Sequence, residues 1–238
     1  MLSADRNPRS PSLRFPFHTA SNPSTLPSVK MQVDSDQVEH IWIVTGPAGC
    51  GKTTVASFLA EQLDVPYIEG DDFHPLANKQ KMSSGQPLTD ADRWDWLITL
   101  REQAVQKLRT KNSVIVTCSA LKHKYRDVIR VANYEHPSVQ IHFIYLKLDE
   151  ATLQQRVKER QGHYMKESMV HSQMTTLEEP EEDQEWDVLR VDVRQDKESV
   201  MHSALDKVRQ KLSEYSSVSG LTNGASGVNG GNVVNGHS

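Results

Sequence analysis

The sequence predicts an α/β fold in which helices cover both faces of a parallel β-sheet, giving three layers. Short apolar runs alternate with longer segments of helical period between residues 40 and 212, and this alternation is typical of βαβ units. The first apolar run leads directly into a glycine-rich segment and then into a helical pattern. That order is expected where a phosphate-binding loop joins a strand to a helix.

The predicted elements follow one another in regular order. Helical periodicity is clearest in two apolar stripes, over residues 94–108 and 200–212, and a helix is expected after each strand. Ligands of such sheets bind at the carboxyl ends of the strands, so polar residues just after each strand are the first functional candidates. The runs that predict strands are Ile41–Val44, Val65–Ile68, Val114–Cys118, Val139–Leu146 and Val188–Val193.

The segment after the first strand has the pattern G-x-x-x-x-G-K-T of a P-loop. Its glycines allow the backbone N–H groups to converge on one concavity, and the helix that follows adds the positive end of its dipole. Lys52 is expected to reach the β- and γ-phosphates of a nucleotide, and the Thr53 hydroxyl to bind Mg²⁺. The predicted nucleotide-binding residues of the loop are Gly46, Pro47, Ala48, Gly49, Cys50, Gly51, Lys52, Thr53 and Thr54.

Composition and charge argue against several classes of partner. The net charge of −4 disfavours nucleic acid, because a phosphate backbone requires a basic surface. No apolar run approaches the roughly 20 residues that cross a bilayer, so we expect no membrane partner. The two cysteines, Cys50 and Cys118, are too few for a disulfide framework and fit a reducing compartment such as the cytoplasm.

The two ends of the chain differ in composition from the middle. Residues 1–37 are rich in Pro, Ser and Asn, and residues 216–238 consist mostly of Gly, Ser, Asn, Val and Thr. Such segments cannot bury enough apolar surface to offset chain entropy. We predict a disordered extension over 1–37, a P-loop domain over 38–215 and a disordered tail over 216–238. A transit peptide is the alternative for the first segment, although its prolines and lack of amphipathic period argue against it.

Two carboxylates near the end of the second predicted strand are candidates for chemistry. Asp71 could accept a proton from an attacking hydroxyl or hold Mg²⁺ through water, although aspartate is also common as a turn residue or helix cap. The third predicted strand lacks the terminal aspartate with which many P-loop ATPases hold Mg²⁺. We therefore assign Asp71 to the chemistry and Glu69, with Thr53, to the metal.

Two arginines lie one helical turn apart after the fourth predicted strand. Arg156 and Arg160 precede a polar segment over about residues 162–179. Arginines at the base of such a segment suit a lid that closes over the γ-phosphate and stabilises the transition state. An exposed helix face with ion pairs to neighbouring acids, such as Glu150, explains the pattern equally well.

The P-loop and four further motifs together resemble the gluconokinase family. The resemblance covers about residues 41–212 and implies the nucleoside-monophosphate-kinase fold, with a lid over 162–179. The His-Pro-x-x-Asn and Lys-Met segments are specific to that family, whereas many families share the P-loop. The four motifs are Gly70-Asp71-x-x-His74-Pro75-x-x-Asn78, then Lys81-Met82 to Trp96-Leu97, Cys118-Ser119-Ala120-Leu121-Lys122-x-x-Tyr125-Arg126-Asp127, and Arg160-x-Gly162-His163.

The resemblance implies phosphorylation of D-gluconate by ATP at its 6-hydroxyl, giving 6-phosphogluconate for the pentose phosphate pathway. ATP and Mg²⁺ are the implied cofactors, and a homodimer is the implied assembly. Lys52, Asp71 and Arg160 are then the expected catalytic residues, with Arg156 and Arg160 contacting ATP. Placement in the matching motifs indicates as substrate-binding residues Asp71, His74, Lys81, Arg93, Ser119, Tyr125 and Arg126.

Charge on the acceptor side predicts an acidic substrate rather than a neutral sugar. A carboxylate would pair with one or two of the cations expected there, ideally in a bidentate contact with an arginine. These cations are Lys81, Arg93, Lys122 and Arg126.

Two other classes of protein are alternatives to a kinase. A nucleotide switch is disfavoured by the lack of a guanine-specifying motif, and an inactive P-loop protein by the intact Lys52, Thr53 and Asp71.

Overall fold

The fold is a five-stranded, wholly parallel sheet with helices on both faces, as the sequence predicts. The computed structural model describes residues 38–159 and 167–222. The strand order is β2-β3-β1-β4-β5, so the first strand of the chain lies at the centre. The strands are β1 (Glu39–Thr45), β2 (Tyr67–Ile68), β3 (Ser113–Thr117), β4 (Val139–Lys147) and β5 (Val188–Asp192).

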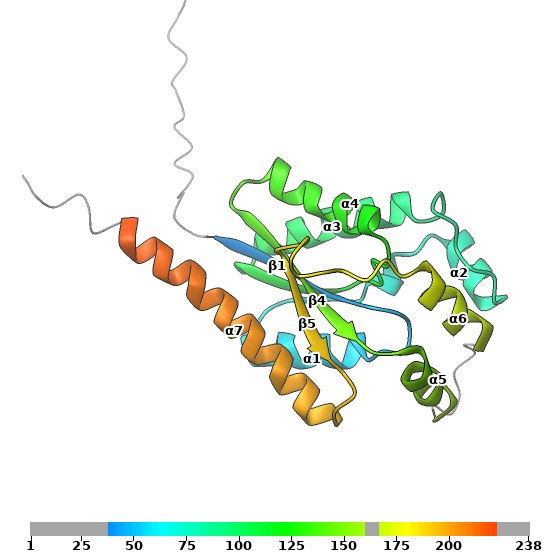
Figure 1. Ribbon diagram of the computed structural model, residues 1–238. Helices are drawn as coiled ribbons and strands as arrows, with labels where there is room; N and C mark the ends of the chain where they lie inside the picture. The colour runs from blue at the N-terminus through cyan, green and yellow to red at the C-terminus, as the bar shows by residue number, and fades with distance from the viewer. Residues whose placement is uncertain (1–37, 160–166, 223–238) are drawn as a thin grey trace, which may run out of the picture. The chain divides into compact units, whose positions relative to one another are not determined.

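The helices form two covering layers and a group at the end of the sheet. Helices α1 and α7 pack together on one face, and α3 and α4 pack together on the other (Figure 1). The shorter helices α2, α5 and α6 lie at the end toward which the strands point (Figure 1). The bounds are α1 (Lys52–Leu63), α2 (Leu76–Ser83), α3 (Trp94–Leu108), α4 (His123–Glu135), α5 (Glu150–Glu159), α6 (Glu167–Thr176) and α7 (Lys197–Thr222), with a 3-10 turn, η1 (Gly70–Phe73).

Strand β1 is buried on both faces, which is why its sequence is an almost continuous apolar run. Its side chains alternate between the two layers. Ile41 and Ile43 pack in the core beneath α3 and α4, whereas Trp42 and Val44 pack beneath α1 and α7. Every one of these four side chains is at most 1% exposed. The loop that follows β1 therefore leaves from the most deeply supported strand of the sheet.

Two details of the fold bear on the sequence predictions. Helix α7 runs to Thr222 and so continues past residue 216, where we expected the tail to begin. Within the described residues, no helix combines the length and the apolar character needed to cross a membrane.

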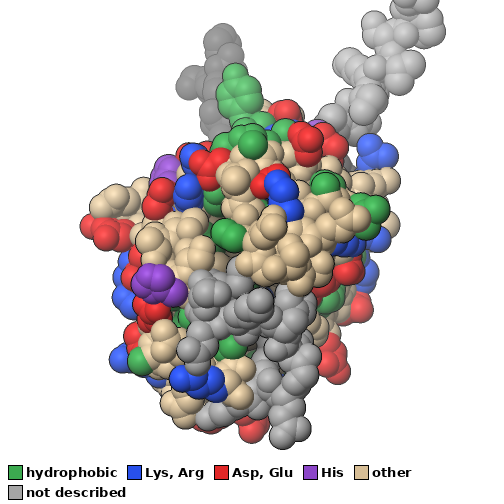
Figure 2. Space-filling view, turned by 90° about the vertical axis from the view of Figure 1, so that its right-hand side faces the viewer, with side chains coloured by type: hydrophobic (Ala, Val, Ile, Leu, Met, Phe, Trp, Pro, Cys, Tyr) green, Lys and Arg blue, Asp and Glu red, His purple; other side chains and the backbone are tan. Residues whose placement is uncertain are grey.

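Figure 2 looks onto the end of the molecule that carries α2, α5 and α6, where Lys and Arg side chains are interspersed with Asp and Glu. No single basic patch dominates the part of this face that is described.

Candidate active site

The glycine-rich loop turns sharply from β1 into α1. Gly49 and Gly51 have φ of 90° and 109°, a left-handed region in which a side chain would be strained. No side chain caps α1, so the first N–H groups of the helix remain available to an anion. Lys52 Nζ donates to the carbonyl oxygens of Gly46 and Pro47, at 3.1 Å each. The loop thus presents an ammonium group and unpaired amides at one place.

Two pockets border this loop within the described residues, one on each side. We call them the α7 pocket and the α6 pocket, after the helix that forms the outer wall of each. The α7 pocket is lined by Gly49, Cys50, Gly51, Thr54, Val55, Arg156, Lys197, Val200 and Met201. The α6 pocket is lined by Ala48, Lys52, Asp71, His74, Met82, Pro87, Leu88, Arg93, Ser119, Leu121, Ser172, Gln173 and Thr176.

Arg156 joins the walls of the α7 pocket. Its guanidinium donates to the carbonyl of Cys50, at 3.2 Å, and to the carbonyl of Val193 just after β5. A guanidinium fixed in this way offers a planar surface on which an aromatic base can stack. Burial raises the pKa of the Cys50 thiol, so this cysteine is a neutral filler of the loop and not a nucleophile.

Glu69 lies where β2 ends and faces the loop. Its carboxylate accepts hydrogen bonds from Thr53 Oγ1 at 2.9 Å, from Tyr67 Oη at 2.5 Å, and from Thr117 Oγ1. Burial raises the pKa of Glu69, but the three hydroxyl donors outweigh it and hold that pKa below its ordinary value. The ionised Glu69 carboxylate and the Thr53 hydroxyl together present oxygen atoms, which are the ligands that a hard divalent cation prefers.

Asp71 follows Glu69 within η1 and lines the α6 pocket beside Lys52. Although its carboxylate is exposed to solvent, the walls of the pocket partly desolvate it and raise the pKa of Asp71, while the charge of Lys52 opposes this. The backbone behind it is tightly packed, because a Cβ on Gly70 would lie 2.0 Å from the carbonyl oxygen of Thr117. Trp96 Nε1 also donates to the Gly70 carbonyl, at 2.8 Å.

His74 forms the floor of the α6 pocket beneath Asp71. Its ring stacks on Trp96 with the ring centroids 4.0 Å apart, and its Nε2 lies 3.8 Å from Asp71 Oδ1. Burial, helped by the positive charges of Arg93 and Lys79, lowers the pKa of His74 to about 4. The imidazole is therefore neutral near pH 7 and supports Asp71 without supplying a charge.

Besides Lys52, the α6 pocket is lined by one other cation, Arg93, for which no ion pair is found among the described residues. Its Nε is buried without a hydrogen-bond partner, and its guanidinium lies 5.5 Å from the centre of the Tyr125 ring. The other cations expected here already have partners. Lys81 Nζ lies 2.6 Å from Asp92 Oδ1, and Lys122 Nζ lies 2.9 Å from Asp90 Oδ1.

Arg126 does not line the α6 pocket, and the expectation that it binds the acceptor is corrected. It is 1% exposed and makes a bidentate contact with Glu185, with both N–O distances at 2.7 Å. It also donates to the carbonyls of Ala120 and Leu121. Ala120 has φ of 35°, a strained conformation for a residue with a Cβ. Arg126 therefore supports the turn that carries Ser119 into the pocket.

Comparisons with known proteins identify the family to which the chain belongs. A protein-family model described as an AAA domain matches residues 41–180. A probable gluconokinase of Schizosaccharomyces pombe is 44% identical over 178 residues, which span 74% of this chain and 91% of that protein. The thermoresistant gluconokinase of Escherichia coli is 42% identical over 171 residues, spanning 72% and 94%. The chain belongs to the gluconokinase family.

Solved structures agree with this assignment to the gluconokinases. A gluconokinase from Sinorhizobium meliloti superimposes with a TM-score of 0.61 at 33% identity, covering 80% of this chain and 98% of that one. A Mycobacterium tuberculosis APS kinase superimposes with a TM-score of 0.51 at 15% identity, over 73% and 96%. The second likeness shows only that the fold is shared with other P-loop kinases.

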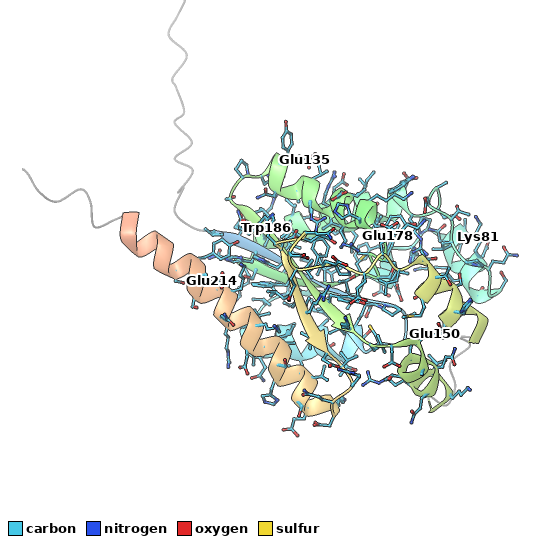
Figure 3. The ribbon with its side chains drawn as sticks, in the orientation of Figure 1. Lys81, Glu135, Glu150, Glu178, Trp186 and Glu214 are labelled. Carbon is cyan, nitrogen blue, oxygen red and sulfur yellow. The ribbon has the colours of Figure 1, made fainter. Side chains whose placement is uncertain are left out.

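The structure brings most of the predicted gluconokinase site together, with three differences. Lys52, Asp71, His74, Arg93 and Ser119 line the α6 pocket. Lys81 and Tyr125 lie outside its lining and instead bind Asp92 and Asp90, and Figure 3 shows Lys81 on α2 at the edge of the molecule. Arg126 is withdrawn into the core, as described above. Arg160, Gly162 and His163 lie outside the described residues.

Two groups of residues at this site were not predicted from the sequence. Thr117, the last residue of β3, and Tyr67, the first residue of β2, fix Glu69 by hydrogen bonds, and their hydroxyl groups in predicted strands could have indicated this. Ser172, Gln173 and Thr176 of α6 form one wall of the α6 pocket. The sequence assigned them only to a polar lid segment, because no charge or spacing distinguishes them there.

Proposed function

We propose that the protein transfers the γ-phosphoryl group of ATP to the 6-hydroxyl of D-gluconate. The observation that carries this proposal is the meeting of three groups in the α6 pocket: the loop lysine, a carboxylate and an arginine without an anionic partner. These are the parts that phosphoryl transfer to a hydroxyl of an acidic substrate requires. Membership of the gluconokinase family supports the same reaction.

In the proposed mechanism, Asp71 accepts the proton of the 6-hydroxyl as its oxygen forms a bond to the γ-phosphorus. The bond between that phosphorus and the oxygen bridging to the β-phosphate breaks, and ADP leaves with the electron pair. Lys52 swings from the carbonyls of Gly46 and Pro47 to neutralise charge on the transferred group. Arg160, at the base of the proposed lid, adds positive charge to the same group.

The remaining parts of the proposal follow from the pockets. The adenine base occupies the α7 pocket against Arg156. The Thr53 hydroxyl and the Glu69 carboxylate would hold Mg²⁺, which would supply positive charge to the phosphates. The Arg93 guanidinium pairs with the carboxylate of gluconate, which satisfies its buried Nε or an adjacent N–H.

Four further assignments are proposals of the same kind. The product enters the pentose phosphate pathway, and the enzyme acts in the cytoplasm as a homodimer. Two buried free thiols, Cys50 and Cys118, support a reducing compartment. The kinase domain is flanked by extensions at 1–37 and 216–238. Helix α7 reaches Thr222 and so runs into the second extension.

The test is acceptor-dependent release of ADP, measured in a coupled assay with gluconate, glucose and shikimate at equal concentrations. We expect kcat/KM for gluconate to exceed that for glucose at least tenfold, about 1.4 kcal/mol, because glucose offers no carboxylate to Arg93. Preference for glucose or shikimate would overturn the assignment of the substrate. Slow ADP release that ignores every acceptor would indicate a nucleotide switch instead.

A further inference from the structure

Helix α6 contributes one side chain that contacts the phosphate loop directly. Gln173 Oε1 accepts a hydrogen bond from the backbone N–H of Ala48 at 2.6 Å. Because an N–H group can only donate, the amide oxygen of Gln173 must face the loop, and this fixes which way the side-chain amide is turned. Its Nε2 group is therefore directed away from Ala48. Both residues line the α6 pocket.

The Nε2 group of Gln173 has two hydrogens to donate. No acceptor for them lies within hydrogen-bond distance among residues 38–159 and 167–222. The neighbouring Thr176 differs in this respect, since its hydroxyl donates to the carbonyl of Ser172 at 2.7 Å. Gln173 thus combines an oriented oxygen with a free donor at the boundary between loop and pocket.

Helix α6 holds Gln173 on a firm support. Val170 is 1% exposed and packs in the core beneath α1 and α7. Leu177, the residue after the helix, packs against the core beneath α3 and α4. Just beyond the helix, Glu178 N donates to the Leu121 carbonyl at 2.9 Å, and its carboxylate accepts from the N–H of His123 at 2.7 Å. Figure 3 shows Glu178 between α6 and α4. The wall of the pocket is therefore fixed at both its loop side and its far end.

We propose that Gln173 is a substrate-binding residue, which donates from Nε2 to a hydroxyl group of the sugar acid while Ala48 holds its oxygen. This proposal rests on the proposed function and deepens it. Arg93 would hold the carboxylate end of the substrate, and Gln173 would hold a hydroxyl close to the loop, where the phosphoryl group arrives. Two such contacts orient an otherwise flexible open chain for transfer, and orientation of this kind is a large part of catalysis.

The test compares Gln173→Ala and Gln173→Glu with Thr175→Ala as the control. Glutamate keeps an acceptor for the Ala48 N–H but loses the donor, so it separates the two contacts of the side chain. Thr175 is exposed on the same helix and lies outside the pocket lining. The measurements are the KM of gluconate, the Kd of ATP by titration without acceptor, and kcat/KM for a set of gluconates that each lack one hydroxyl.

We expect both Gln173 variants to raise the KM of gluconate about fivefold, the amount that one hydrogen bond is typically worth. The Kd of ATP for Gln173→Ala stays within twofold of the wild type, and Thr175→Ala changes neither the KM nor the Kd. One deoxy-gluconate, about fivefold poorer than gluconate for the wild type, becomes equivalent to gluconate for both variants. A merely structural residue would not remove discrimination at a single hydroxyl.

Two results would overturn the proposal. The first is that both variants retain the wild-type KM and the full pattern of deoxy-gluconate discrimination. The second is that only the Kd of ATP changes, which would make Gln173 a residue of the nucleotide site. Failure of the wild type itself to phosphorylate gluconate would instead overturn the proposed function, so the two failures are distinguishable. If Gln173→Ala does not fold, Gln173→Glu alone decides between these outcomes.

Discussion

The α7 pocket takes most of its loop side from one continuous stretch, Gly49–Val55, whereas the α6 pocket is assembled from segments between Ala48 and Thr176. Helix α1 and its preceding turn supply that stretch by local geometry, while Arg156 of α5 and three residues at the start of α7 complete the first pocket. The second depends on tertiary packing to bring η1, the start of α3, the turn after β3 and α6 together. The nucleotide side is therefore shared by many P-loop families, and the acceptor side distinguishes them.

The same contrast appears in how charge is arranged. In the α7 pocket, Arg156 donates to two uncharged backbone carbonyls, so no acidic side chain neutralises it in these contacts. On the acceptor side, Lys81 and Lys122 are already neutralised by aspartates. Arg93 alone among the expected acceptor cations lacks an anion within the described residues. Acceptor recognition thus depends on very few charges, which makes it sensitive to single substitutions.

Lys52→Ala should have the largest effect, because Lys52 serves both sides of the comparison. We expect kcat to fall about 10²–10³-fold, as when one preorganised electrostatic donor is removed from a transition state. The melting temperature should stay near that of the wild type, because the Lys52 side chain is only half-buried and its ammonium group donates to two backbone carbonyls. Lys107→Ala, on the exposed side of α3, is the control. A variant that keeps more than a tenth of the wild-type turnover would contradict this role.

Asp71→Asn should lower kcat about 10²-fold, at the low end for loss of a general base, because phosphoryl transfer is loose. The pH profile gives a second readout. Since the base must be ionised and desolvation raises the pKa of Asp71 above its ordinary value, wild-type activity should decline as the pH falls through this raised pKa. The variant should lose that limb of the profile. Asp72→Asn is the matched control, and a greater loss in it would move the role to Asp72.

Arg93→Met should weaken only the acceptor side. We expect kcat/KM for gluconate to fall about 10–100-fold, because one or two charge-assisted hydrogen bonds are lost. The Kd of ATP should be unchanged, and the preference for gluconate over glucose should largely disappear. Steady-state kinetics with both acceptors provide the measurement, and a preserved preference would show that another group holds the carboxylate.

Arg126→Met should have the smallest effect on substrate choice and a large effect on stability. Breaking a buried ion pair costs about 3–5 kcal/mol, measurable as the free energy of unfolding in urea. The ratio of kcat/KM for gluconate to that for glucose should stay at the wild-type value, because the Arg126 charge does not reach the pocket. If this ratio fell as it does for Arg93→Met, the distinction between the two arginines would be wrong.

The sequence predicted the parallel sheet and its five strands, because these depend on local patterns. Apolar runs bounded by turn signals indicate strands, although β2 is confined to Tyr67–Ile68 where Val65–Ile68 was expected. The P-loop pattern is likewise local, and its nucleotide-binding residues stay a prediction. The acceptor side was predicted in part. Arg93 and Arg126 lie in similar motifs and carry the same charge, and only the packing of Glu185 against α4 decides which one is free. Gln173 could not be found, because its importance comes from one hydrogen bond across 125 residues of chain.

The central place of β1 has a consequence for the order in which the protein forms. Residue Ile41 pairs with Val114 on one side and with Ile141 on the other, so one edge of β1 waits for Thr117 to be made and the other edge waits for Tyr145. Contacts this distant in sequence slow folding, because closing the long loop between them costs chain entropy before the contacts can form. On the ribosome, the phosphate loop thus emerges well before the two strands that support β1. During that interval the apolar strand before it is exposed, which is the time when the new chain most needs protection from aggregation.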